Sequence, residues 1–220
     1  MHGALSRISP ITGANNMVGP VDNNELDLYL ASASPRRRQL LSQIGIRFKV
    51  ISGIVIDESQ HEAETPEQYV GRLARDKALA GYFRISSQLQ GECPEIPPVL
   101  GADTCITIDG DILGKPTGRD DGIAMLQRLS GRSHKVLTAI LLYDGRKERH
   151  SLCQSVVSIK TLALDEIECY WESGEPADKA GAYAIQGAAA KFITHLQGSY
   201  SGVVGLPLYE LSELLQSSRK

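Results

Sequence analysis

The sequence predicts an α/β fold in which a mixed β-sheet is flanked by helices. Two observations predict it. Stretches with the spacing of strands and of helices alternate irregularly along the 220 residues, and two long strand-like stretches are joined only by the turn at Asp144–Gly145. Strands joined by so short a turn run antiparallel, whereas strands joined through helices run parallel. The sheet is therefore expected to be mixed rather than purely parallel.

The first predicted strand leads directly into a helix. "LDLYLAS" (26–32) is a short apolar run typical of a buried strand. Ser34 suits an N-cap, Pro35 suits the first helical position and Gly45 suits the end of the helix. "IRFKVIS" (46–52) then alternates apolar and polar residues, which indicates a second strand.

The middle of the chain is predicted to contain a long helix and a hairpin. An acidic loop (56–64) precedes "TPEQ" (65–68), a capping box with proline at the first helical position, which opens a helix through "YVGRLARDKALAGYF". After a Pro-rich linker, "VLGADTCITIDGDILGKP" (99–116) indicates a strand, a short break, a second strand and a turn. Its Asp109–Gly110 pair is a hairpin signal.

The last third of the chain is predicted to continue this mixed pattern. A helix is expected in "DDGIAMLQRLSG" (120–131), two long strands in residues 134–162, and a helix in "DEIECYWESG" (165–174). Short strands and turns are expected to alternate from residue 182 to residue 204, and a last helix to begin near Pro207.

Length and composition are those of one large domain, expected over residues 26–220. Residues 1–25 mix Gly, Asn, Ser and Pro with isolated apolar residues, and we expect them to form a flexible arm. No apolar run has the length of a membrane span, and the net charge of −3 argues against general affinity for nucleic acid. The four cysteines form no CxxC pair, so reduced thiols and a cytoplasmic location are expected.

Several motifs of familiar nucleotide-binding and hydrolytic sites are missing. There is no GxGxxG and no HExxH. "GDILGKP" has three residues between its glycines and places Pro116 where a P-loop needs Ser or Thr. "GSYSG" places Tyr200 where a nucleophile elbow needs serine. P-loop ATPases, Rossmann dehydrogenases, serine hydrolases and zinc proteases are therefore disfavoured.

The start of the first helix carries an unusual run of arginines. Arg36, Arg37 and Arg38 follow Ser34 and Pro35, although the helix macrodipole disfavours positive charge at that end. The free N–H groups of a helix N-terminus together with guanidinium groups can bind an anion. A bound anion would explain the run, and a solvated basic helix start is the alternative.

Acidic and basic residues elsewhere would complete a site for a polyphosphate. Asp57 and Glu58 follow the second strand, and Asp103 is expected to end an apolar strand, where a buried carboxylate needs a partner or a metal. Lys77 lies on the long helix and Lys115 in a tight turn. Each has a structural alternative: a solvated acidic loop, a turn aspartate or an exposed lysine. Together they predict phosphoryl chemistry, which needs Mg²⁺ and cationic clamps.

With these residues assembled, the chain resembles the Maf family (septum formation inhibitor Maf) of the inosine-triphosphate-pyrophosphatase-like superfamily. The matching stretches follow in family order from about Leu28 to Leu215: "LASASPRRRQLL", "IDES", "RLARDKA", "LGADT", "GKP", "LSGRSHKVLTA", "DKAGAYAIQG" and "GSYSGVVGLPL". The resemblance implies an elongated mixed sheet with two lobes and a central cleft. It also implies hydrolysis of nucleoside triphosphates to the monophosphate and pyrophosphate with a divalent metal cation (Mg²⁺ or Mn²⁺), often in a homodimer.

The resemblance also implies roles for individual residues. Asp103 of "GADT" would be the proton acceptor that activates water, and Glu58 of "IDES" would bind the metal together with Asp103. The residues that would contact the triphosphate are Ser34, Arg37, Lys77 and Lys115. The stretch before "IDES" is one residue longer than the usual family spacing, so either Asp57 or Glu58 could be the metal ligand.

Three positions distinguish two branches of the family. Arg36, Thr104 and Gln186 match the branch of the dTTP/UTP pyrophosphatases, whereas an aromatic residue, Gln and Glu mark the branch that handles 7-methyl-GTP. An amide can donate and accept at once, as uracil and thymine require, although Gln186 could instead satisfy backbone groups. The predicted function is hydrolysis of dTTP, UTP and modified pyrimidine triphosphates. The alternatives are hydrolysis of 7-methyl-GTP and a non-catalytic regulator of septum formation.

Overall fold

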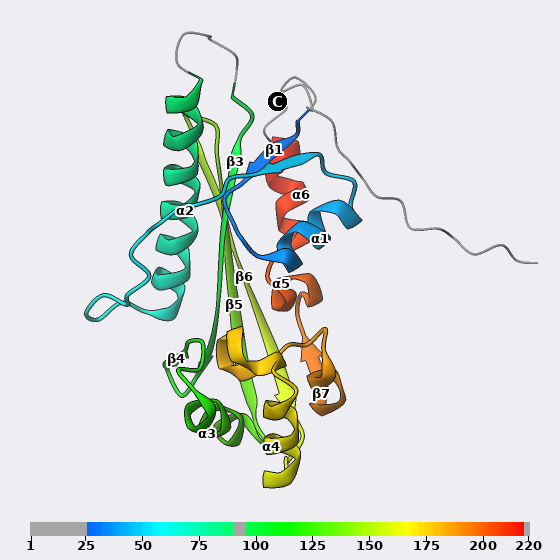
Figure 1. Ribbon diagram of the computed structural model, residues 1–220. Coiled ribbons are helices and arrows are strands. Elements are labelled where there is room, and N and C mark those ends of the chain that lie inside the picture. Colours follow the sequence, from blue (N-terminus) through cyan, green and yellow to red (C-terminus); the bar gives the residue numbers. More distant parts are fainter. Residues whose placement is uncertain (1–25, 90–95, 218–220) are drawn as a thin grey trace, which may run out of the picture.

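A seven-stranded mixed sheet runs along the molecule in the computed structural model, which describes residues 26–89 and 96–217 (Figure 1). The strand order is β2-β1-β3-β5-β6-β7, and β4 pairs with β3 outside this order. The strands are β1 (Leu28–Leu30), β2 (Phe48–Val50), β3 (Val99–Ile108), β4 (Asp111–Leu113), β5 (Ser133–Tyr143), β6 (Glu148–Ile159) and β7 (Ile193–Gln197). The predicted arm, residues 1–25, lies outside the described residues.

Three long strands connect two lobes. β3, β5 and β6 have 10, 11 and 12 residues, and β5 pairs antiparallel with both β3 and β6. At one end β1 pairs parallel with both β2 and β3, and at the other end β4 and β7 pair antiparallel with β3 and β6. The sheet therefore contains both orientations, and the predicted mixed sheet is confirmed.

Helices cover both faces of this sheet. In the upper part of Figure 1, α2 lies along one face, while α1, α5 and α6 lie on the opposite face, and α3 and α4 belong to the lower lobe. The helices are α1 (Pro35–Gln43), α2 (Pro66–Gln88), α3 (Arg119–Leu129), α4 (Leu164–Glu172), α5 (Tyr200–Val204) and α6 (Leu208–Ser217), with 3-10 helices η2 (Glu175–Asp178), η3 (Ala180–Ala182) and η4 (Ala188–Phe192). Within the described ranges, no helix has both the length and the apolar character needed to cross a bilayer.

The local signals read from the sequence form as predicted. The Ser34 side chain accepts a hydrogen bond from the Arg37 N–H and caps α1. Thr65 and Gln68 form a capping box at the start of α2, with distances of 3.3 Å and 2.9 Å. Asp109 and Gly110 both have positive φ (56° and 91°) and join β3 to β4, as in a two-residue hairpin.

The segment from residue 182 to residue 204 differs from its prediction. It holds one strand, β7, but also η4 and α5 in place of further short strands. The run "AAAKF" forms η4, since alanine has low strand propensity. Ser199 caps α5 by accepting a hydrogen bond from the Gly202 N–H at 3.0 Å.

The close contact between α2 and β3 depends on Gly101. A Cβ atom at this position would lie 2.0 Å from the carbonyl oxygen of Ala74 and 2.6 Å from the nitrogen of Ala78. The backbone of α2 therefore lies directly against β3, which no larger residue at position 101 would permit. Lys77 is carried by the same part of α2, and this contact brings it to β3.

The core of the lower lobe contains a buried histidine. His134 is 3% exposed, and its Nε2 lies 2.7 Å from the Tyr183 hydroxyl. Burial lowers the pKa of His134 from 6.5 to about 4. Between these two values the unfolded chain binds a proton that the folded chain does not. The free energy of unfolding should therefore fall as the pH is lowered through this range.

We expect this loss to be on the order of 2 kcal/mol between pH 7 and pH 4.5. Urea unfolding at both pH values, on the native chain and on His134→Gln, measures it. The pH-dependent loss should be smaller in His134→Gln and unchanged in a control at an exposed histidine, His195→Gln. Equal losses in the native chain and His134→Gln would contradict the prediction.

Candidate active site

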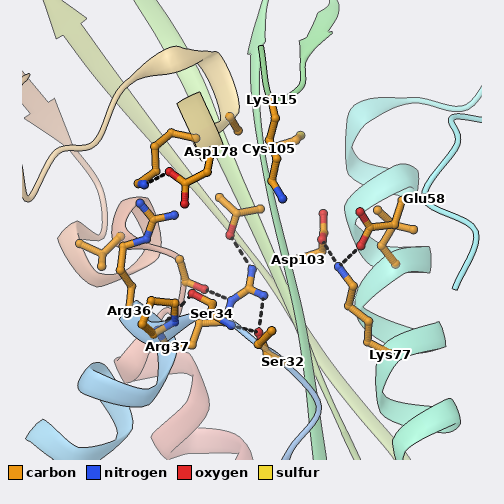
Figure 2. A pocket seen from close by; sticks show the side chains of 18 of the residues that line it. Ser32, Ser34, Arg36, Arg37, Glu58, Lys77, Asp103, Cys105, Lys115 and Asp178 are labelled. Carbon is orange, nitrogen blue, oxygen red and sulfur yellow. Dashed lines mark hydrogen bonds and ion pairs between the residues drawn. The ribbon is translucent and has the colours of Figure 1, made fainter. Parts of the chain in front are cut away.

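One cavity of about 990 Å³ brings together the candidate residues from separate parts of the chain (Figure 2). It is lined by α1, the loop before α2, α2 itself, β3, the turn after β4, and the segments around η2 and η3. The predicted site residues that line it are Ser34, Arg36, Arg37, Glu58, Lys77, Asp103, Thr104, Lys115 and Gln186. Neither Arg38 nor Asp57 is among the residues that line this cavity.

The cavity opens where one edge of β3 has no neighbouring strand. β1 pairs with Val99 and Leu100, and β4 pairs with residues 106–108. Between them, no strand of the described chain pairs with this edge at residues 101–105. The prediction that Asp103 ends a strand was wrong, because it is the fifth of ten residues in β3, which pairs with β5 along its length. The neighbouring strand ends there instead, and this gives Asp103 access to the cavity.

A lysine lies between the two carboxylates that were predicted to act together. Lys77 Nζ is 2.7 Å from Asp103 Oδ1 and 2.8 Å from Glu58 Oε1 (Figure 2). The hydrogen bond from Lys77 holds the pKa of Glu58 below its usual value, and the charges of Lys115 and Arg37 act in the same direction. Asp103 itself is only 9% exposed. Glu58 is therefore ionised at neutral pH and close to Asp103.

The loop that carries Glu58 is held from α2. Arg72 donates to the carbonyl oxygens of Asp57 at 3.2 Å and of Ser59 at 2.8 Å, and the Tyr69 hydroxyl donates to the carbonyl of Glu58 at 2.9 Å. The carboxylate of Asp57 accepts the N–H of Ser59 at 2.9 Å and is exposed. Of the two acidic candidates, Glu58 therefore faces the cavity, and Asp57 stabilises the turn of the loop.

Arg37 is fixed by three acceptors from three parts of the chain. Its Nε donates to the carbonyl of Gly205 at 2.8 Å, Nη1 to Ser32 Oγ at 3.1 Å and Nη2 to Thr104 Oγ1 at 3.3 Å. Burial lowers the pKa of Arg37, and the nearby Asp103 opposes this effect; an arginine stays charged at neutral pH. These bonds use three of the five N–H groups of the guanidinium, so two remain for a ligand.

Lys115 and Gln186 come from the lower lobe. Both side chains line the cavity and are exposed, so a ligand can reach them. The turn that holds Lys115 is tied to η3 by a hydrogen bond from the Gly181 N–H to the Gly114 carbonyl at 2.9 Å. This bond joins the segments that carry Lys115 and Gln186.

Two charged residues of the cavity were not predicted. Asp178 and Lys179 line it next to each other, and the side chain of Lys179 donates to that of Asp178. The pKa of Asp178 is lowered by this hydrogen bond and also by the charge of Arg36. The stretch "DKAGAYAIQG" contains the signal that could have identified them, an acid–base pair directly before an apolar run.

The charges of the cavity favour an anion. Five cations line it (Arg36, Arg37, Lys77, Lys115 and Lys179) against three carboxylates (Glu58, Asp103 and Asp178), which leaves an excess of two positive charges. Such an excess in a concave site concentrates anions. The cavity therefore suits a ligand with several negative charges.

The donor set also fits a divalent cation bound together with a phosphate ligand. Among the described residues, no group of three or more His, Cys, Asp or Glu side chains could hold a metal ion. Mg²⁺ is usually held by one or two carboxylates, with water and phosphate oxygens completing its shell. Glu58 and Asp103 are oxygen donors of this kind, both within hydrogen-bond distance of one ammonium group.

Comparisons with known proteins agree on one family. The family model described as Maf-like protein matches residues 27–218. A dTTP/UTP pyrophosphatase of Alkalilimnicola ehrlichii is 51% identical over 86% of this chain and 91% of its own length. Proteins of the same name are 50% identical in Pseudoalteromonas atlantica (86% of this chain, 95% of the relative) and 48% identical in Aromatoleum aromaticum (86% and 94%).

Proposed function

The chain belongs to the Maf family, and on this premise we propose that it hydrolyses dTTP and UTP to the monophosphate and pyrophosphate. The observation that carries the proposal is the convergence of cationic residues and two carboxylates on one cavity. The names of the relatives supply the two substrates. Arg36, Thr104 and Gln186, which match the pyrimidine branch, line the same cavity.

Asp103 acts as the general base in this proposal. Its carboxylate takes a proton from the water that attacks the triphosphate, and the bond between the α- and β-phosphates breaks. Lys77, 2.7 Å away, fixes the orientation of the carboxylate. Pyrophosphate leaves with the electrons of the broken bond, and the cations of the cavity neutralise its charge.

In this proposal the cationic residues other than Lys77 hold the phosphate chain. Arg37 offers its two remaining N–H groups. The N-terminus of α1 offers the backbone N–H of Arg36, because Pro35 has no N–H and those of Arg37 and Arg38 already donate to Ser34. Lys115 enters the same space from the turn after β4 (Figure 2). Glu58 and Asp103 would hold Mg²⁺ or Mn²⁺, which when bound neutralises phosphate charge and polarises the reacting group.

The proposal also includes the cellular location, the oligomeric state and the class of ligand. The free thiols of Cys105, Cys153 and Cys169 support a reducing compartment, the cytoplasm. The family resemblance supports a homodimer and a single domain over residues 26–220. The net charge of −3 supports free nucleotides rather than nucleic acid as ligands.

Pyrophosphate release from a panel of nucleoside triphosphates, with Mg²⁺ or Mn²⁺, tests the proposal. We expect the highest kcat/KM values with dTTP and UTP. Preference for 7-methyl-GTP would assign the chain to the other branch of the family. Inactivity on every triphosphate would reject the enzyme and leave the alternative of a non-catalytic regulator of septum formation.

Gln186→Glu should alter the choice of base more than the rate of the chemical step. An amide can both donate to and accept from the edge of a pyrimidine, whereas a carboxylate only accepts. We expect the ratio of kcat/KM values between UTP and 7-methyl-GTP to fall by about tenfold or more, the scale of one misplaced hydrogen bond. Gln197→Glu, the same change at an exposed position of β7, is the control. If only kcat fell, equally for both substrates, Gln186 would not contact the base.

A further inference from the structure

Behind the cavity, two threonines form a hydrogen-bonded chain that ends at Arg37. Thr138 of β5 lies directly opposite Thr104 of β3 in the sheet and is 1% exposed. The Thr138 hydroxyl donates to the carbonyl of Gly202 in α5 at 2.8 Å. The two threonine oxygens are 3.0 Å apart, and Thr104 Oγ1 accepts from Arg37 Nη2 at 3.3 Å.

The direction of each bond in this chain follows from counting hydrogens. A threonine hydroxyl has a single hydrogen. Because the hydrogen of Thr138 is directed at the Gly202 carbonyl, the hydrogen between the two hydroxyls belongs to Thr104. The lone pairs of Thr104 are then free to accept from Arg37. The Thr104 hydroxyl can therefore accept a hydrogen bond from a ligand in the cavity but has no hydrogen left to donate.

We propose that Thr138 is a positioning residue for nucleotide binding, and that it acts through Thr104 on Arg37. This inference rests on the proposed function, in which Arg37 holds the phosphate chain. α5 and its C-cap hold both ends of the arrangement. The carbonyl of Gly202 in α5 accepts from Thr138, and the carbonyl of the C-cap residue Gly205 accepts from Arg37 Nε. Hydrogen bonds at three nitrogens then orient the guanidinium before the nucleotide arrives.

Removing the Thr138 hydroxyl would break the chain at its buried end. In Thr138→Val the Gly202 carbonyl keeps the Gly205 N–H but loses the donor from Thr138, and the hydrogen of Thr104 loses its acceptor. The Thr104 side chain is then no longer held in its orientation by Thr138, and the contact that it accepts from Arg37 Nη2 is weakened. Thr138→Ser keeps the hydroxyl and should keep the chain intact.

A double-mutant cycle with Arg37→Ala tests the inference. The probe is α,β-methylene-UTP, which is not hydrolysed, and its dissociation constant is measured by isothermal titration calorimetry. We expect Thr138→Val to weaken binding by about tenfold in the native background, and Thr138→Ser to restore most of the loss. In the Arg37→Ala background, Thr138→Val should change the affinity by less than about twofold, because its effect passes through Arg37.

The cycle separates a failed inference from a failed proposed function. An equal loss from Thr138→Val in both backgrounds would overturn the inference and leave the proposed function intact. An unchanged affinity in Arg37→Ala would overturn the inference and remove Arg37 from the binding of the phosphate chain, whereas a native chain that neither binds the probe nor releases pyrophosphate would overturn the proposed function. Thr107→Val, at a buried threonine of β3 that does not line this cavity, should bind the probe like the native chain. If Thr138→Val does not fold, Thr138→Ala, which also removes the hydroxyl and leaves Thr104 in place, serves in the same cycle with the same expectations.

Discussion

Replacing Asp103 with asparagine should lower the turnover number by ~10²–10⁴ while the fold is retained. The amide has the shape of the carboxylate and can still accept the hydrogen bond that Lys77 makes at 2.7 Å. It cannot take the proton of the attacking water, and the general base is lost. Pyrophosphate release under saturating dTTP or UTP measures kcat, and urea unfolding tests whether the fold is intact.

Asp111→Asn is a matched control for this prediction. Asp111 lies on β4, pairs with Arg128 at 2.6 Å and does not line the cavity. The same chemical change there should leave kcat unaltered. A near-normal kcat in Asp103→Asn would remove Asp103 from its role as general base, whatever happens in the control.

Gly101→Ala should cause a large loss of stability. The new methyl group would meet backbone atoms of α2, 2.0 Å from the Ala74 carbonyl oxygen, so no side-chain rotation can relieve the clash. We expect the free energy of unfolding to fall by about 1–3 kcal/mol or more, because overpacking forces the backbone to shift. The shift also moves Lys77 away from Asp103, so kcat/KM should fall as well.

Gly71→Ala is the control, because it adds the same methyl group to α2 itself. A Cβ atom at Gly71 has no atom within 4 Å, and alanine favours a helix over glycine by about 1 kcal/mol. Urea unfolding should therefore show no loss, or a gain, in Gly71→Ala. Identical unfolding curves for Gly101→Ala and the native chain would mean that α2 adjusts without cost.

Local signals in the sequence predicted most of the fold. Ser34, Thr65 and the Asp109–Gly110 pair act through their own neighbours, so the elements that they begin or join could be read directly. The region from residue 182 to residue 204 could not, because its elements are too short for a periodic pattern. The place of Asp103 was misread for another reason. Whether a strand edge is paired depends on strands that are distant in sequence.

The candidate site was predictable as a set of residues but not as an arrangement. Motifs singled out four of the five cations and two of the three carboxylates, but not Asp178 and Lys179. The convergence of these residues depends on the fold of the whole sheet. Which of Asp57 and Glu58 faces the cavity could be decided only from the structure, because it depends on the direction in which each side chain points. Thr138 carries no distinct sequence signal, because threonine is common in β-strands. Its proposed role could be inferred only from its position opposite Thr104 in the sheet.

The unbroken course of β3, β5 and β6 through both lobes has a mechanical consequence. The lobes share one hydrogen-bonded ladder, so they cannot swing apart about a flexible joint. The cavity can therefore widen only if these three strands bend or twist together. We therefore expect entry of the nucleotide and exit of pyrophosphate to depend on bending of the sheet rather than on rotation about a hinge.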